Sequence, residues 1–485
     1  MTTKLLRAKT LALVFAGAAA AAPPLSAQTT FHKYVALGDS LTAGVQGACL
    51  VGRNQQTAYP KLVANSLGIT DFELPLVGES ATVTSPASAC LGARISGTSI
   101  VPGPVSQPGA PLNATLARPY DDLGIPFARV RDLVDLKTSN PTGGGVQSAA
   151  ALVLRNFPGS PYNGLSAVDE ANLLSPDLVS LWIGNNDVLG AATSGVAIEG
   201  VTVTPKAAFD AKYAEVVDGI RHSGRTLIFL NIPDVTAIPF ATTIPIQRTV
   251  GANTIRFLGP RTTATCATAP CPLPDGSLLT LQAQALLGQG IGIPIAAGGT
   301  GQPLPDGGFD PGTSTVTPGV ILYPDEVALL QARTNDYNAT IASTAAANGG
   351  ILIDVHGILD DIKANGFSVA GINLNSGLLI GGLFSADGVH PSNIAQAIIA
   401  DEIILTLNRV AGTDYPEPDF SAAFFTPNVP PGAATLRANE LWPALLENLP
   451  DGLSFALPVE ERAAPVLPAR PRRAPRAASG RQPGL

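Results

Sequence analysis

The chain has 485 residues and a net charge of −8, and only 14% of its side chains are charged, against about 25% in an average soluble protein. The hydrophobic fraction of 45% is enough for a large core, so the composition excludes a disordered polyelectrolyte and a coiled coil. The acidic balance also argues against nucleic acid as a partner. Glycine (50 residues) and proline (43 residues) are abundant, which predicts many turns and long loops.

The first 27 residues have the pattern of a cleavable secretory signal. Lys4, Arg7 and Lys9 precede an apolar run at 11–22, and a small-residue cleavage site ends at Ala27. A membrane anchor is the alternative, but this run is short for a hydrocarbon core about 30 Å thick, and no later stretch reaches about 18 apolar residues. We therefore expect a secreted or periplasmic protein with no transmembrane segment after signal removal. The pattern does not predict an oligomeric state.

Four cysteines fit an oxidising compartment, and free thiols are the alternative if the protein is not secreted. Cys266 and Cys271 are close enough in sequence to close a local loop, and Cys49 and Cys90 would then pair. Four cysteines allow three connectivities, so this pairing is one hypothesis among three. A zinc site would need more ligands at finger-like spacing than the four histidines supply, and we expect no metal.

Buried, β-branched runs alternate along the chain with segments of helical periodicity. Strands are expected at residues 33–37, 72–77, 178–183, 226–232 and 351–355, and helices at 60–67, 207–221, 325–347 and 393–409. The second strand is weak because Pro75 interrupts it, and Ser392 is a candidate N-cap of the last helix. The alternation predicts a three-layer α/β/α sandwich around a mainly parallel five-stranded sheet.

Two stretches rich in Gly, Pro, Ser and Thr interrupt this alternation, at about 85–116 and 241–319. The second is too long for an ordinary loop, and we expect it to form a subdomain or lid over the sheet edge. The predicted organisation is then a signal peptide (1–27), one α/β domain that contains both insertions (28–410), an extension packing on the core (411–462) and a disordered Pro/Arg-rich tail (463–485).

Three motifs place polar residues beside predicted strands or before the last helix. GDSL at 38–41 ends the first strand, GNND at 184–187 follows a strong strand, and DGVH at 387–390 precedes the last helix. Ligands of parallel α/β sheets bind at the carboxyl ends of the strands. Each motif alone also has a structural explanation: a helix-capping Asp–Ser pair, a turn of Gly and Asn, or a surface Asp–Gly turn beside a bystander histidine.

Together and in this order, the three motifs resemble blocks of the SGNH/GDSL hydrolase superfamily, over residues 31–409 without the two insertions. NIPD at 231–234 is similar to the lipolytic branch of that superfamily. The resemblance implies a flavodoxin-like sheet and a secreted bacterial-type esterase or lipase. One block, which supplies a glycine N–H, is imperfectly matched. Gly78 is the candidate there, with Glu79 or Ser80 as alternatives.

The resemblance also implies a role for each residue. Ser40 would attack an ester carbonyl, His390 would take its proton and later pass it to the leaving alcohol, and Asp387 would orient the imidazole. The N–H groups of Ser40 and Gly78 and the side-chain amide of Asn186 would hold the oxyanion. Water would then hydrolyse the acyl-enzyme, and no cofactor or metal would be required.

The low charge of the insertions favours carboxylic esters of lipids or other acyl chains as substrates. A carbohydrate O-acetylesterase is the alternative within the enzymes, although only 5% of the residues are aromatic and could stack on sugars. The alternative from another class is a non-catalytic secreted binding or adhesion protein on the same fold. The joint presence of Ser40, Asn186, Asp387 and His390 argues against it, because binding alone needs none of them.

Overall fold

The computed structural model of the chain describes residues 30–78, 93–96, 99–102, 111–250, 252–369, 372–378 and 382–420. The predicted signal peptide, the tail at 463–485 and most of the extension at 411–462 lie outside the described residues. The same is true of Cys90 and of most of the insertion at 85–116. No helix in the described part of the chain is long and apolar enough to span a membrane.

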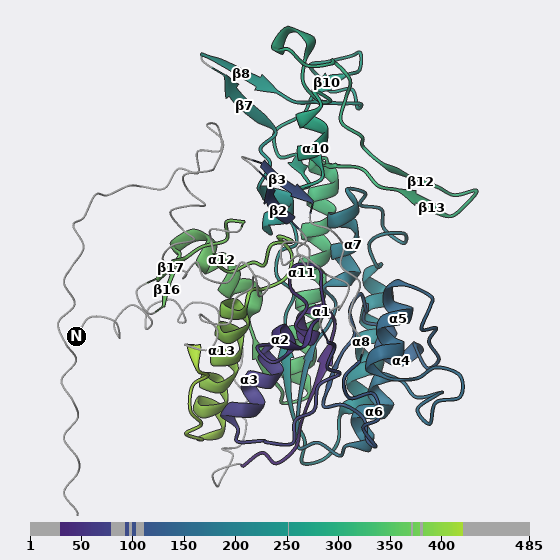
Figure 1. Cartoon of the computed structure of the whole chain (residues 1–485), viewed down its shortest axis with the longest axis vertical. Coiled ribbons are helices and arrows are strands. Elements are labelled where there is room, and N and C mark those ends of the chain that lie inside the picture. The colour runs from purple at the N-terminus through teal and green to yellow at the C-terminus, as the bar shows by residue number, and fades with distance from the viewer. Residues whose placement is uncertain are drawn as a thin grey trace, which may run out of the picture. The chain divides into compact units, whose positions relative to one another are not determined.

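A parallel sheet forms the centre of the molecule (Figure 1). Its strand order is β15-β6-β5-β1-β4, and all four neighbouring pairs are parallel. The strands are β1 (Tyr34–Gly38), β4 (Asp122–Gly124), β5 (Leu178–Trp182), β6 (Thr226–Leu230) and β15 (Ile351–Ile353). The predicted five-stranded α/β/α sandwich is therefore confirmed.

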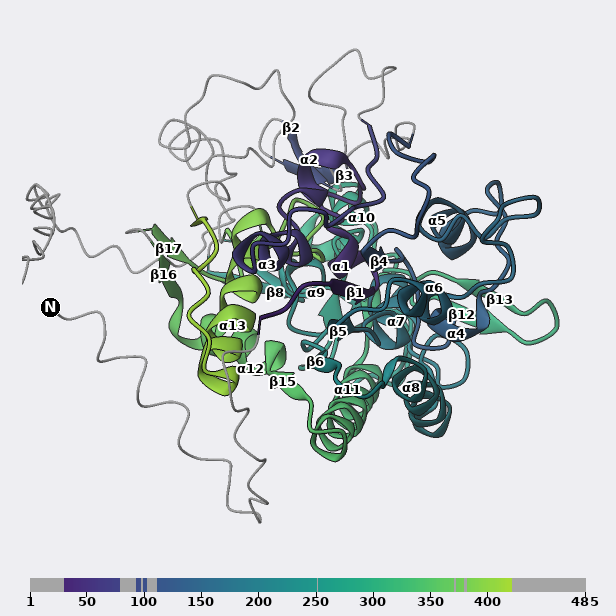
Figure 2. The same cartoon turned by 90° about the horizontal axis from the view of Figure 1, so that it is seen from below.

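Helices cover both faces of the sheet (Figure 2). Side chains alternate along a strand, so Val35 and Leu37 pack into one hydrophobic cluster and Tyr34 and Ala36 into the other. The first face is covered by α4 (Asp132–Asp135), α5 (Gly145–Val153), α6 (Ala167–Leu173), α7 (Asn186–Ser194), α8 (Lys206–Ile220) and α11 (Pro324–Ala347). The second face is covered by α3 (Tyr59–Ser66), α12 (Val355–Asn365) and α13 (Asn393–Ala411). Burial on both faces explains why the main strands are apolar throughout.

The predicted strand at 72–77 is wrong, and β4 occupies the place beside β1 instead. The backbone at 72–77 forms no regular ladder: it makes only isolated backbone hydrogen bonds, such as those from Asp121 N (2.9 Å) and Asp122 N (3.3 Å) to Glu73 O, and several bonds to side chains. Gln55 donates to Pro75 O (2.8 Å) and accepts from Val77 N (2.9 Å), and Asn113 donates to Leu74 O (2.7 Å). A residue without an N–H, Pro75, cannot complete a ladder there.

The last helix begins where the sequence predicts. Ser392 is the N-cap of α13, and its hydroxyl accepts from Ala395 N at 3.3 Å. The predicted helices at 60–67, 207–221 and 325–347 correspond to α3, α8 and α11. Capping and apolar periodicity are local signals, so these elements could be recognised without tertiary information.

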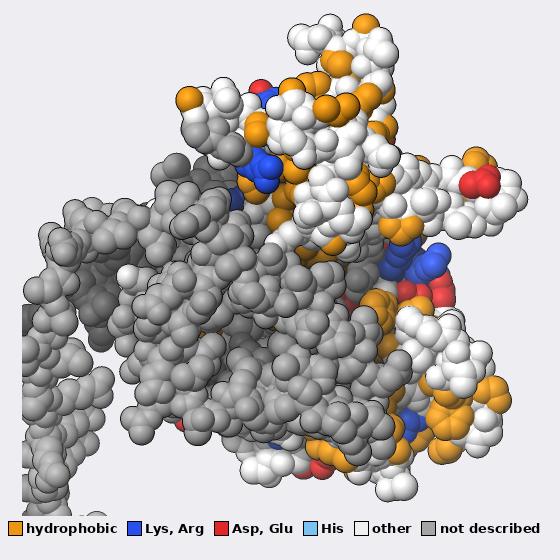
Figure 3. All heavy atoms as spheres, turned by 45° about the horizontal axis from the view of Figure 1, so that its top comes forward, with side chains coloured by type: hydrophobic (Ala, Val, Ile, Leu, Met, Phe, Trp, Pro, Cys, Tyr) orange, Lys and Arg blue, Asp and Glu red, His pale blue; other side chains and the backbone are white. Residues whose placement is uncertain are grey.

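Residues 241–319, here called the inserted segment, are built from short hairpins at the top of Figure 1. They contain a hydrophobic cluster that includes Leu273, Leu279, Ile293 and Leu304. Their elements are β7 (Gln247–Val250), β8 (Asn253–Arg256), β9 (Leu258–Gly259), β10 (Cys271–Pro272), β11 (Leu278–Leu279), α10 (Ala283–Gly288), β12 (Gly308–Asp310) and β13 (Thr315–Thr317). Figure 3 shows many hydrophobic and few charged side chains on this part of the surface.

Contacts at the base of the inserted segment join it to α11. The strand β11 pairs with β14 (Ile321–Leu322), which leads into α11. Arg261, which pairs with Asp306 (2.5 Å) inside the inserted segment, also forms an ion pair with Glu326 of α11 (2.9 Å), and its guanidinium lies 4.0 Å from the ring centre of Tyr323. The inserted segment is thus attached through both its backbone and its charged groups.

Candidate active site

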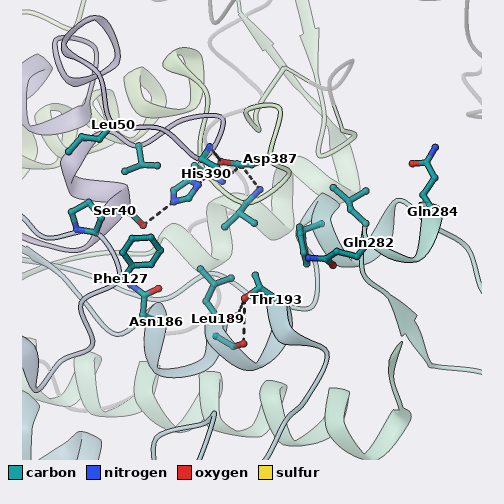
Figure 4. Close-up of a pocket in the computed structure, with 17 residues that line it drawn as sticks. Ser40, Leu50, Phe127, Asn186, Leu189, Thr193, Gln282, Gln284, Asp387 and His390 are labelled. Atoms are coloured by element: carbon teal, nitrogen blue, oxygen red, sulfur yellow. Dashed lines mark hydrogen bonds and ion pairs between the residues drawn. The ribbon is translucent and has the colours of Figure 1, made fainter. Parts of the chain in front are cut away.

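The three sequence motifs meet at the carboxyl ends of β1 and β5 (Figure 4). Ser40 is the first residue of α1 (Ser40–Ala43), one residue after the end of β1, and Asn186 is the first residue of α7, close after β5. Asp387 and His390 lie in the loop before α13. All four line one pocket of about 430 Å³. The structure therefore brings together residues that are up to 350 positions apart in the chain.

His390 lies between Ser40 and Asp387 in a continuous hydrogen-bonded chain. Its Nε2 is 3.0 Å from Ser40 Oγ, and its Nδ1 is 2.7 Å from Asp387 Oδ2. The Ser40 side chain is buried and lines the pocket. This geometry allows the imidazole to accept the hydroxyl proton while the carboxylate holds the other ring nitrogen as N–H.

Five donors surround the Asp387 carboxylate. Oδ1 accepts from Ser385 Oγ (3.0 Å) and from the N–H groups of Val389 and His390 (both 2.9 Å). Oδ2 accepts from His390 Nδ1 and from Ala48 N (2.7 Å). Burial acts to raise the pKa of Asp387, but the charge of His390 and these hydrogen bonds outweigh it and lower the pKa well below its usual range. The group is therefore held as a carboxylate.

The same contacts act on the imidazole. Burial acts to lower the pKa of His390, but the charge of Asp387, its hydrogen bond and the nearby Asp39 outweigh burial and raise the pKa above 6.5. Asp39 is itself fully buried, and burial raises its pKa to about 6 against the hydrogen bonds from Asn185 and Leu41. Those bonds, 2.9 Å long each, also fix the start of α1 and hence the backbone at Ser40.

The start of α7 holds the loop that follows β4. Asn186 Nδ2 donates to Ala128 O at 2.9 Å, and Asp187 Oδ2 accepts from Val130 N at 2.9 Å. Phe127, just before these two residues of the loop, lines the pocket with a side chain that is 63% exposed. Its φ of +70° lies in the left-handed region that favours glycine.

Phe127 was not found from the sequence. Within the described part of the chain, its N–H has no hydrogen-bond acceptor. Ser40 N, at the start of a helix, also has no partner within that helix. Both N–H groups are therefore without an acceptor among the described residues, and their residues line the same pocket as Asn186. The only local signal was the turn chemistry of Gly124 and Pro126, because a left-handed phenylalanine has no sequence signature.

The structure does not bring Gly78 to this site. Gly78 is not among the residues that line the pocket, and its neighbour Val77 accepts at its carbonyl from Gly52 N (2.7 Å), in α2 (Gly52–Gln55). Gly78 follows the predicted strand at 72–77, whereas the strand beside β1 in the structure is β4. The alternatives Glu79 and Ser80 lie outside the described residues.

The cysteine predictions are partly resolved. Cys266 and Cys271 form a disulfide, which closes the predicted local loop in the inserted segment. Cys49 is also disulfide-bonded, and Cys90 lies outside the described residues. Cys49 directly follows Ala48, whose N–H binds Asp387, so a covalent constraint acts on the loop that supports the site.

A family model described as GDSL-like Lipase/Acylhydrolase matches residues 34–403. The chain belongs to this family. The matched range includes Ser40, Asn186, Asp387 and His390, and membership supports ester hydrolysis as the general reaction. A comparison with curated proteins gives no match.

Several solved structures are similar to this chain at low identity. They include a lipase/acylhydrolase from Enterococcus faecalis (12% identity, 78% of this chain and 96% of that chain covered, TM-score 0.31). An extracellular lipase from Streptomyces rimosus shows 16% identity, coverage of 78% and 99%, and a TM-score of 0.28. Phospholipase A1 from Streptomyces albidoflavus NA297 shows 14% identity, coverage of 79% and 100%, and a TM-score of 0.29. At these TM-scores the likeness does not bear on the substrate of this chain.

Proposed function

We propose that this protein is a secreted or periplasmic serine ester hydrolase that cleaves carboxylic esters of lipids or other acyl chains. The observation that carries the proposal is the placement of His390 between Ser40 Oγ (3.0 Å) and Asp387 Oδ2 (2.7 Å) in one pocket. Nucleophile, base and orienting acid within hydrogen-bond reach of one another are the requirement for this type of catalysis.

In the proposed reaction, Ser40 Oγ attacks the ester carbonyl carbon while His390 Nε2 takes the hydroxyl proton. The Oγ–C bond forms, and the carbonyl π electrons move to the oxygen. His390 then gives the proton to the leaving alkoxide as the C–O bond breaks, which leaves an acyl-enzyme. A water molecule, activated by the same imidazole, repeats the sequence and releases the acid. Asp387 keeps the imidazole in the productive tautomer throughout.

The oxyanion would be held by the N–H of Ser40, the side-chain amide of Asn186 and the N–H of Phe127. In this proposal Phe127 replaces Gly78 as the backbone donor, because Phe127 lines the pocket and its N–H has no acceptor among the described residues. Asn186 has one amide hydrogen committed to Ala128 O and a second one for the substrate. Loss of one such donor typically costs about 10²–10³ in turnover.

Secretion is part of the same proposal. The signal-like pattern at 1–27 supports it, and so do the disulfide between Cys266 and Cys271 and the disulfide-bonded Cys49. Disulfides form and persist mainly in oxidising compartments. Expression with the native N-terminus, followed by N-terminal sequencing of the exported protein, tests whether cleavage occurs near Gln28.

The function is tested with p-nitrophenyl acetate, butyrate and octanoate and with an acetylated sugar, using the full chain, its Ser40→Ala variant and Ser343→Ala as the matched control. Ser343 is exposed on α11. We expect the wild type and Ser343→Ala to hydrolyse the acyl esters and Ser40→Ala to be inactive but folded. A wild type that hydrolyses the acetylated sugar but none of the p-nitrophenyl esters would favour the carbohydrate O-acetylesterase. A folded wild type that hydrolyses no substrate would favour the non-catalytic binding protein.

A further inference from the structure

The candidate active-site pocket continues away from Ser40 as a trench between α7 and the inserted segment (Figure 4). Leu189 and Thr193 of α7 form one side. The other side is lined by Phe240, in α9 (Pro239–Thr242) directly before the inserted segment, and by Leu281 within that segment, so part of the pocket wall comes from outside the α/β core. The residues named here define the trench. Neither Phe240 nor Leu281 belongs to any of the sequence motifs.

The chemistry of the trench is that of a hydrocarbon site. Thr193 contributes little polarity, because its hydroxyl donates to Leu189 O at 3.0 Å. Gln282 and Gln284 are the polar residues at the outer end, and the only charged side chains that line the pocket in the described part of the chain are Asp387 and His390. Apolar side walls, with polar groups only at the reacting end and at the outer end, suit a chain of methylenes, whereas a sugar would leave its hydroxyls unpaired along these walls.

The wall is connected directly to the loop that contains Asp387 and His390. Phe240 N donates to Gly388 O at 2.9 Å, and Leu281 N donates to Phe240 O at 2.9 Å. Gly388 has a φ of +71°, and a Cβ there would lie 2.9 Å from Phe240 N and 3.3 Å from the Leu281 side chain. Close contact and two successive backbone hydrogen bonds therefore hold Leu281 at a constant distance from the reacting groups.

We propose that this trench binds the linear hydrocarbon chain of the ester substrate, and that Leu281 determines how long a chain is accepted. The inference rests on the proposed function, since it names the substrate class of the same site. A fixed wall selects by length because each buried methylene adds binding energy until the chain passes the wall. The chain can belong to the acid or to the alcohol of the ester, and the two arms of the experiment distinguish these sources.

The experiment measures kcat/KM for two series on the full protein. One series varies the acyl chain of p-nitrophenyl esters from acetate to decanoate, and the other varies the alcohol of alkyl acetates over the same lengths. In the wild type we expect kcat/KM to rise by roughly fourfold per methylene over the first few carbons in at least one series. Leu281→Trp, which fills the trench, should lower the octanoate-to-acetate ratio, or the octyl-to-ethyl ratio, at least tenfold.

Leu173→Trp is the matched control, because Leu173 is 61% exposed on α6 and does not line the pocket. Leu281→Ala is the second variant if the tryptophan prevents folding, and it should move the length of the best substrate. A wild type without length preference in either series, or a Leu281→Trp protein with the wild-type ratios, would overturn the proposal. The proposed function is tested separately, by hydrolysis of p-nitrophenyl acetate in the wild type and its loss in Ser40→Ala. If that result holds while chain length has no effect, the trench proposal fails and the proposed function stands.

Discussion

The hydroxyl of Ser385 joins the candidate triad to the loop that precedes α2. It donates to Asp387 Oδ1 (3.0 Å) and accepts from Gly47 N (3.0 Å), and the side chain is buried. Ser385→Ala removes both bonds and leaves the Gly47 N–H without its acceptor. Ser385 touches none of the reacting atoms, so we predict a role in positioning Asp387.

The size of the effect follows from these contacts. Two lost hydrogen bonds at about 1 kcal/mol each, with a further cost of up to about 2 kcal/mol for an unsatisfied buried N–H, lower the free energy of unfolding by about 2–4 kcal/mol. Asp387 keeps four of its five donors, including the imidazole. We therefore expect kcat to fall only about tenfold, against about 10⁴ when the acid of such a triad becomes an amide.

The assay combines urea unfolding with p-nitrophenyl acetate kinetics at a temperature where the variant is folded. Ser385→Thr, which retains a hydroxyl, should recover most of kcat, and KM should change little in either variant. Unchanged stability and kcat in Ser385→Ala would refute the positioning role. So would a loss of kcat as large as that of Asp387→Asn, because Ser385 would then be as essential as the acid itself.

Three further predictions concern charge and backbone strain. The acidic limb of kcat/KM should have its midpoint above pH 6.5, because His390 must be neutral to act as base and Asp387 raises its pKa; a midpoint below 6.5 would contradict this. Phe127→Gly should raise the free energy of unfolding, measured by urea denaturation, by up to about 1 kcal/mol, since glycine adopts the left-handed φ of this position without steric cost. A lower free energy of unfolding would contradict the presence of backbone strain at Phe127. Burial raises the pKa of Glu170 to about 9. Glu170 therefore loses its proton on unfolding at neutral pH, and the free energy of unfolding falls as pH rises from about 5 to 9. Glu170→Gln should flatten the dependence of Tm on pH in this range, and an unaltered dependence would contradict the prediction.

Local signals identified much of the site. Ser40 and Asn186 follow β1 and β5, which are five-residue buried strands, and their positions at the sheet edge follow from parallel topology. Asp387 and His390 are close in sequence, so a short loop is enough to join carboxylate and imidazole. Their distance to Ser40 could only come from the resemblance to a family, because no local rule connects segments so far apart.

The missed features depend on tertiary structure. The strand β4 has three residues and includes the buried Asp122, whose pKa is raised to about 8 by burial, so it lacks an apolar pattern. The Asp122 side-chain oxygen Oδ1 accepts a hydrogen bond from Gly124 N at 2.9 Å, and β4 ends at Gly124. With β4 unrecognised, the loop carrying Phe127 was not placed at the site. Leu281 was likewise beyond prediction, since only folding of the inserted segment brings it to the pocket.

Covalent labelling tests most directly whether Ser40 is an activated nucleophile. The folded wild type is treated with a fluorophosphonate, and the adduct is located by peptide mass spectrometry, with heat-denatured protein and Ser40→Ala as controls. The proximity of His390 Nε2 to Ser40 Oγ (3.0 Å) predicts one phosphonyl group per chain, on Ser40, in the folded wild type and in neither control. A folded wild type without label, or a label that persists in Ser40→Ala, would contradict the proposed mechanism.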